Sequence, residues 1–196
     1  MALLYESGLR SRVRKYAMDS GTRRSDSAVL EHVAKRENAD RHDIFLSHAY
    51  VDHDLILGAA LMIEEFGFKV YIDWRDDTTL SRNAVTHKTA RRLREQLKRS
   101  RCLLYCTTEN ANNSRWMPWE LGYKDGHCGR VAVLPVAKDL RASDDYEGQE
   151  YLGIYPYVTS GKDTREKERL WINISETNYV SFDAWLEGKE PYERRK

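Results

Sequence analysis

The sequence predicts an α/β fold in which a parallel β-sheet is covered by helices on both faces. From Asp43 onward, short apolar runs typical of buried strands alternate with stretches whose apolar residues recur at helical spacing. Strands that alternate with helices favour a parallel sheet, because a parallel connection needs a crossover segment that a helix can supply. Five such strands make a flavodoxin-like doubly wound sheet, with strand order 2-1-3-4-5, the simplest topology.

The expected strands are short runs rich in apolar residues and bounded by polar ones. They span residues 43–47, 69–73, 101–106, 130–136 and 170–174. Each run is five to seven residues long, within the four to eight residues usual for buried strands.

Start and stop signals delimit the helices between and after these strands. The first spans 55–66 and ends at Gly67, because glycine accepts the left-handed conformation of a helix end. An apolar stripe over 90–97 predicts the second helix. Ser114 is expected to cap the third, and a fourth follows over 181–186.

The flanking segments have a different composition. Residues 1–40 are rich in arginine and carry apolar residues at helical spacing, so we expect a short helical N-terminal extension. The main domain is expected over 41–188 and a charged tail over 189–196. Within the domain, 138–169 is expected to be a long irregular loop, and such loops are often functional.

Composition excludes several classes of function. The net charge of +1 gives no global attraction for nucleic acid, and no apolar run approaches the roughly 20 residues of a membrane span. The start of the chain lacks a secretory signal, and the three cysteines favour reduced thiols over a disulfide framework, so we expect a cytoplasmic protein. The acidic cluster Asp73, Asp76 and Asp77 could bind a divalent cation, but it is interpreted as a loop with solvated carboxylates, and no metal site is expected.

Ligands of doubly wound sheets bind beyond the carboxyl ends of the strands, where the strand order reverses. In this sequence that point lies between the first and third strands. The rule indicates Ser47 and His48 after the first strand, and Thr107 onward after the third.

Three segments resemble the motifs of the TIR (Toll/interleukin-1 receptor) family, in the family's order. Asp43-Ile-Phe-Leu-Ser-His-Ala49 resembles the first motif, and Val70-Tyr-Ile-Asp-Trp-Arg-Asp-Asp77 resembles the second strand with its BB loop. Ser114-Arg-Trp-Met-Pro-Trp-Glu-Leu-Gly-Tyr123 is similar to the third. The likeness covers about residues 41–136, and the family resemblance includes its bacterial NAD-cleaving members, such as the TIR subunit of Thoeris antiphage systems.

The resemblance implies a role for each matching residue. Glu120 would be the catalytic glutamate of the NAD-cleaving members, with Trp116 one turn earlier on the same helix face. Ser47 and His48 would line the nicotinamide side of the pocket, Trp74 and Arg75 would belong to the BB loop, and Ser114 would shape the entrance to the helix that bears Glu120. These five residues and Trp116 are the expected substrate-binding residues.

The chemistry is compatible with a single carboxylate. Breaking a ribosyl bond passes through an oxocarbenium-like transition state, which a nearby carboxylate stabilises. Cationic nicotinamide leaves as a neutral molecule and needs no proton, so one glutamate can suffice.

Structural interpretations stand beside these functional ones. Glu120 can simply be a first-turn carboxylate that interacts favourably with the helix dipole, and Trp116 can be an ordinary core residue. Ser114 can be a helix cap, His48 a satisfied structural histidine, and Trp74 a packing residue.

The expected function is therefore an NAD glycohydrolase or cyclase, with NAD as substrate and no separate cofactor. Self-association through the BB loop and a separate effector activated by the product are the implied partners. Two alternatives remain: a non-catalytic TIR adaptor, and a nucleoside deoxyribosyltransferase or nucleotide hydrolase with related ribosyl chemistry.

Overall fold

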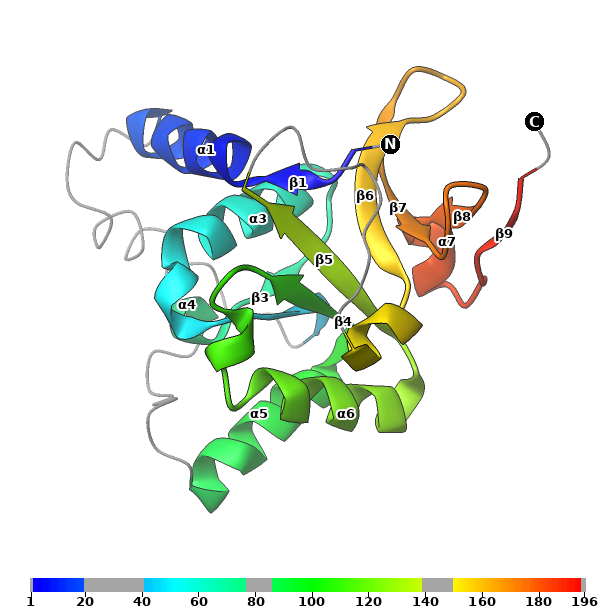
Figure 1. The fold of residues 1–196 in the computed structure, drawn as a ribbon. Helices are drawn as coiled ribbons and strands as arrows, with labels where there is room; N and C mark the ends of the chain where they lie inside the picture. Colours follow the sequence, from blue (N-terminus) through cyan, green and yellow to red (C-terminus); the bar gives the residue numbers. More distant parts are fainter. Residues whose placement is uncertain (1, 20–40, 77–85, 139–149, 195–196) are drawn as a thin grey trace.

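The computed structural model describes residues 2–19, 41–76, 86–138 and 150–194, which form one β-sheet with helices on both faces (Figure 1). The centre of the sheet has the order β3-β2-β4-β5, and all three pairs are parallel. These strands are β2 (His42–Ser47), β3 (Val70–Tyr71), β4 (Ser100–Thr107) and β5 (Val131–Ala137). The predicted fold class is confirmed. When the expected strands are numbered along the chain from β2 as the first, the first four lie in the predicted order 2-1-3-4.

Beyond β5 the sheet differs from the prediction of five parallel strands. The strand beside β5 is β6 (Tyr157–Lys162), which lies inside the segment expected to be an irregular loop. The expected fifth strand is β7 (Glu168–Asn173), and it pairs with β6 in the antiparallel direction. The antiparallel part continues with β8 (Asn178–Ser181) and β9 (Tyr192–Glu193), the latter within the expected charged tail.

The physical reason for this difference is the short connection between β6 and β7. The carboxylate of Asp163 accepts backbone N–H bonds from Arg165 and Lys167, at 2.8 and 3.0 Å, and so closes a tight turn. A turn of this length can join only antiparallel strands, because a parallel pair needs a crossover of a dozen or more residues.

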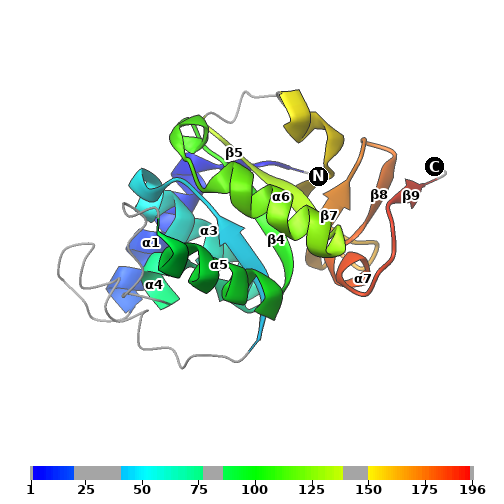
Figure 2. The same cartoon turned by 90° about the horizontal axis from the view of Figure 1, so that it is seen from below.

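Alternate residues of the central strands face two separate apolar layers. Ile44 and Leu46 pack with α1 (Glu6–Asp19), α3 (His53–Glu65) and α7 (Phe182–Leu186). Phe45, between them, packs with α5 (His87–Arg99) and α6 (Met117–Cys128) on the opposite face. Figures 1 and 2 show α1 and α3 on one side of the sheet and α5 and α6 on the other. This alternation follows from the two-residue period of a strand.

The N-terminal segment is built into the same sheet and core. Strand β1 (Leu4–Tyr5) pairs in parallel with the end of β5, and Leu9 of α1 is buried against α3. The two helices approach so closely that a Cβ atom on Gly58 would lie 2.5 Å from the carbonyl oxygen of Leu9. The expected N-terminal helix is thus observed over Glu6–Asp19, and residues 20–40 lie outside the described part of the chain.

Short helical segments follow the ends of the central strands. They are η1 (Tyr50–Asp52) after β2, α4 (Asp73–Asp76) after β3 and η2 (Ala111–Asn113) after β4; η3 (Glu150–Ile154) precedes β6.

Within the four described stretches, none of the helices combines the length and apolar composition that a membrane crossing requires.

Candidate active site

Ser47 and Glu120 meet at the carboxyl end of β2. Ser47 is the last residue of that strand, Glu120 lies in the first turn of α6, and the Ser47 hydroxyl donates a hydrogen bond of 2.6 Å to Oε2 of Glu120. Neither side chain has any exposed surface. The meeting point adjoins strands β2 and β4, where the expected strand order reverses, so the structure brings two of the predicted site residues into direct contact.

The start of α6 explains how the carboxylate reaches this position. The helix begins at Met117, two residues later than expected, and the Met117 N–H donates to Oγ of Ser114 at 3.3 Å. Glu120 therefore lies in the first turn, where unpaired backbone N–H groups favour a negative charge. The cap position of α6 is Trp116, so Ser114 is not the cap residue that the sequence predicts, although its hydroxyl accepts a backbone N–H of the first turn.

The indole of Trp116 is packed into the apolar layer beneath α6. Only 9% of the residue is exposed, and its ring meets the ring of Trp119 at 5.4 Å in an edge-to-face arrangement. Leu121 and Met117 belong to the same buried cluster. The observed contacts are those of a core residue, which was one of the two interpretations open for Trp116.

His48 is buried next to Ser47, with a protein group facing each of its ring nitrogens. Nδ1 lies 2.8 Å from the carbonyl oxygen of Leu46, and Nε2 lies 3.4 Å from Oδ1 of Asp73. The Trp74 ring packs against it in an edge-to-face arrangement, with 6.4 Å between the ring centroids. These are structural contacts, and they link the end of β2 to the start of α4.

Trp74 also contacts His53 at the start of α3. The two rings meet at 5.0 Å in an edge-to-face arrangement, and burial lowers the pKa of His53 although the Asp73 carboxylate opposes this change. Trp74 is partly buried and packs against the apolar layer on the α3 side. The contacts of Trp74 are therefore those of a packing residue.

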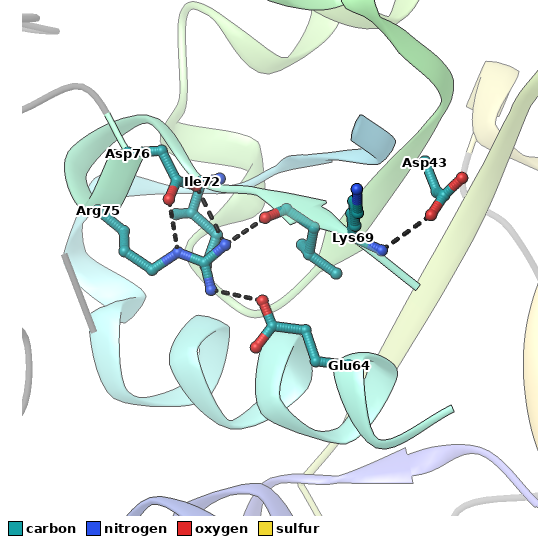
Figure 3. A network of polar contacts seen from close by, with 7 residues as sticks. Asp43, Glu64, Lys69, Ile72, Arg75 and Asp76 are labelled. Atoms are coloured by element: carbon teal, nitrogen blue, oxygen red, sulfur yellow. Dashed lines mark hydrogen bonds and ion pairs between the residues drawn. The ribbon is translucent and has the colours of Figure 1, made fainter. Parts of the chain in front are cut away.

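Arg75 does not join the Ser47–Glu120 pair. Its guanidinium donates to Glu64 at 2.8 Å, to both oxygens of Asp76 at 3.0 and 3.1 Å, and to the carbonyl of Val70 (Figure 3). Burial alone would lower the pKa of Arg75, but the carboxylates of Asp76 and Glu64 outweigh burial and raise it. The structure thus places Arg75 in a buried network that holds α4 against β3 and α3.

The interpretation of Asp73 and Asp76 as solvated carboxylates is wrong. Asp73 is 2% exposed and faces His48, and the Asp76 side chain is 13% exposed and bonded to Arg75. Carboxylates at a strand end can be stabilised by buried partners from other elements, which a local sequence pattern does not reveal. Asp77 lies outside the described residues.

Asp52 is a second carboxylate that sequence reasoning did not assign to the site. It is 7% exposed and accepts hydrogen bonds from the hydroxyl of Thr108 and, at 2.7 Å, from the side-chain amide of Asn110. These bonds fasten the loop after β2 to the loop after β4. The prediction that residues from Thr107 onward lie at the strand-end crevice pointed to this region without naming its acidic partner.

Two cavities lie away from the Ser47–Glu120 pair. One of about 740 Å³ is lined by residues of α1, α3 and the β6–β7 hairpin, among them Arg12, Phe66 and Arg169. A neighbouring cavity of about 410 Å³ lies along α1 and α3. None of the predicted site residues lines either cavity.

The parallel centre of the sheet, with Ser47 and Glu120 at the carboxyl end of β2, agrees with the TIR-type α/β fold that the sequence motifs predict. No family model matches the chain. It is 44% identical over 161 residues, 81% of this chain and 83% of the relative, to "Probable 3' cyclic ADP-D-ribose synthase ThsB'" of Bacillus cereus (strain MSX-D12). At this identity and coverage, the chain belongs to the same family, the Thoeris-type TIR-domain proteins.

A more distant relative carries a similar name. The chain is 28% identical over 114 residues to "Putative cyclic ADP-D-ribose synthase TIR2" of Cytobacillus dafuensis. The match covers 58% of this chain and 28% of that protein.

Proposed function

We propose that the protein cleaves the bond between nicotinamide and ribose in NAD and closes the remaining ADP-ribose into a cyclic signal. The observation that carries this proposal is the buried Ser47–Glu120 pair at the carboxyl end of β2. Two relatives support it, one named a probable and the other a putative cyclic ADP-D-ribose synthase. NAD is the substrate, and the proposed reaction uses no separate cofactor.

Glu120 is the proposed catalytic residue. As the C–N bond breaks, positive charge develops on the ribose and the bonding electron pair leaves with nicotinamide, which departs as a neutral molecule. A carboxylate fixed at that position stabilises the developing charge, and its effect is larger in a site that excludes water. The hydrogen bond from Ser47 fixes the carboxylate before the substrate arrives.

Exclusion of water also favours a cyclic product. Ser47 and Glu120 have no exposed surface in a single chain. Once the site has opened and NAD fills it, a ribosyl cation formed beside them meets few water molecules. A nucleophile from the ADP-ribose part of the same molecule then forms the new bond to the ribose carbon. If that nucleophile is a hydroxyl, it releases one proton, and Glu120 is the proposed acceptor.

The test is to incubate the purified protein with NAD, separate the products by chromatography, and compare wild type with Glu120→Gln. We expect nicotinamide release to fall by about 10²–10³-fold in the variant. Glu176→Gln is the matched control, because Glu176 is exposed in the turn between β7 and β8. Full activity in Glu120→Gln contradicts the proposed role, and a folded wild type that leaves NAD intact supports the adaptor alternative.

We further propose that the enzyme works as an assembly in the cytoplasm, and that its product activates a separate effector in antiphage defence. The full burial of Glu120 within one chain supports a site that opens only when copies associate through the loop after β3. Free thiols at Cys102, Cys106 and Cys128 fit a reducing compartment. Specific activity is expected to rise with protein concentration, and a flat concentration series would contradict the assembly.

A further inference from the structure

We propose that His48 and Asp73 are positioning residues for Glu120, which hold the Ser47 hydroxyl in place instead of contacting NAD. The inference rests on the proposed function and deepens it. It also gives His48 a different role from the pocket-lining one that the family resemblance implies.

The ring of His48 holds the backbone on both sides of Ser47. Its Nδ1 atom faces the carbonyl of Leu46, at 2.8 Å, so the side chain folds back across the residue that precedes it. Ser47 lies between these two residues, and its hydroxyl must point at Glu120 to make the 2.6 Å hydrogen bond. A rotation of the His48 ring would release the Leu46 carbonyl and allow the Ser47 hydroxyl to turn away.

Asp73 fixes the other side of the ring. Its Oδ1 atom lies 3.4 Å from Nε2 of His48, and the two side chains are 2% and 0% exposed. A buried carboxylate is costly unless polar or charged groups face it. The contact between the Asp73 carboxylate and the His48 ring therefore joins α4 to the end of β2, two separate elements of the fold.

The Arg75 network anchors the helix that presents Asp73. Arg75 binds Glu64 of α3, and Asp76 accepts the backbone N–H of Ile72 at 2.7 Å (Figure 3). These contacts fix α4 at its start and at its end, so Asp73 cannot drift without breaking them. Contacts thus run from α3 through α4 to His48, and from there to Ser47 and Glu120.

The first test compares steady-state kinetics for NAD in wild type and Asp73→Asn, which keeps the size of the side chain and removes its charge. We expect kcat to fall by about 10- to 100-fold, because small misplacements of a catalytic group have effects of that size. KM is expected to stay within twofold of wild type, since Asp73 does not touch the substrate. Asp54→Asn is the control, because Asp54 lies at the exposed start of α3 and should change neither constant.

A second variant covers the case in which Asp73→Asn does not fold. His48→Asn can still donate a hydrogen bond toward the Leu46 carbonyl but loses the contact with Asp73, so it should show the same split between kcat and KM. The double variant should be no worse than the more impaired single variant, since both remove the same link. A raised KM with unchanged kcat in either single variant would make the residue a substrate contact and overturn the proposal.

A readout without substrate separates this inference from the proposed function. The carboxyl ¹³C signal of Glu120, assigned with Glu120→Gln, should shift in Asp73→Asn and remain in place in Asp54→Asn. If wild type leaves NAD intact while the signal shifts as expected, only the proposed function fails. An unchanged Glu120 signal in both Asp73→Asn and His48→Asn would overturn the positioning role, whatever the activity.

Discussion

Replacement of Arg75 by methionine tests whether this residue stabilises the fold or binds substrate. Its guanidinium is 3% exposed and bonds Glu64, Asp76 and the Val70 carbonyl. Removing one partner of a buried ion pair costs about 3–5 kcal/mol, because the remaining charge stays buried. The side chains of Glu64 and Asp76 are 12% and 13% exposed, so water relieves part of this penalty, and we expect the free energy of unfolding to fall by about 3 kcal/mol.

The assay is equilibrium unfolding in urea, followed by circular dichroism, together with a thermal melt. For a chain of this length, the expected loss corresponds to a fall in Tm of roughly 6–12 °C. Arg91→Met is the control: the Arg91 side chain is 76% exposed and 3.8 Å from Glu95, so its loss should change stability by less than about 0.5 kcal/mol. A double-mutant cycle with Glu64→Gln should give a coupling energy of about 1 kcal/mol or more.

The opposite outcome would refute this reasoning. If Arg75→Met matches the control in stability but raises KM for NAD, the guanidinium binds substrate and the buried network contributes nothing. Such a result would restore the assignment of Arg75 to the substrate site that the family resemblance implies.

Three further perturbations test the fold. Gly58→Ala should destabilise by about 1–3 kcal/mol in urea unfolding, since its Cβ would meet the Leu9 carbonyl at 2.5 Å, and unchanged stability would contradict this. In the folded protein a thiol reagent should modify exposed Cys128 first, because burial raises the pKa of the Cys102 thiol; equal rates would be inconsistent with the core. A hydrogen bond from the Arg169 side chain lowers the pKa of Asp163 from 3.8 to about 2. The stability that ionised Asp163 contributes should therefore be present above pH 3.8 and lost as the pH falls through 2. Asp163→Asn should remove that part of the pH dependence of unfolding.

The central strands could be predicted because their signal is local. Strands β2, β4 and β5 are buried on both faces, so their sequences are nearly continuous apolar runs. Strand β6 has a polar sequence whose polar groups are satisfied by partners on β7. The Asn173 amide donates to Thr159 at 2.9 Å, and the Trp171 indole donates to the Gly161 carbonyl at 2.9 Å. These partners are ten or more positions away in the sequence, so the segment taken by itself is predicted to be a loop.

The same distinction applies to the candidate site. Ser47 and Glu120 could be placed from the sequence, because the strand end and the helix start that carry them have clear local signals. The pairing of His48 with Asp73 joins two strand ends 25 positions apart, and the residue types alone allowed a cation site or a solvated loop. The buried network of Arg75 could not be predicted for a similar reason, since one of its partners, Glu64, lies on the preceding helix.

The position of α6 depends on two buried polar side chains that lie one turn apart on its inner face. Glu120 accepts the hydroxyl of Ser47, and Lys124, only 1% exposed, donates to the carbonyl of Leu97 at 2.9 Å and to that of Ser100. A cation at these carbonyls is favourable, because they end α5 and carry the negative end of its dipole. Each contact satisfies a group whose burial would otherwise be costly. The helix cannot rotate without breaking both, so the position of the proposed catalytic carboxylate depends on α5 as well as on β2.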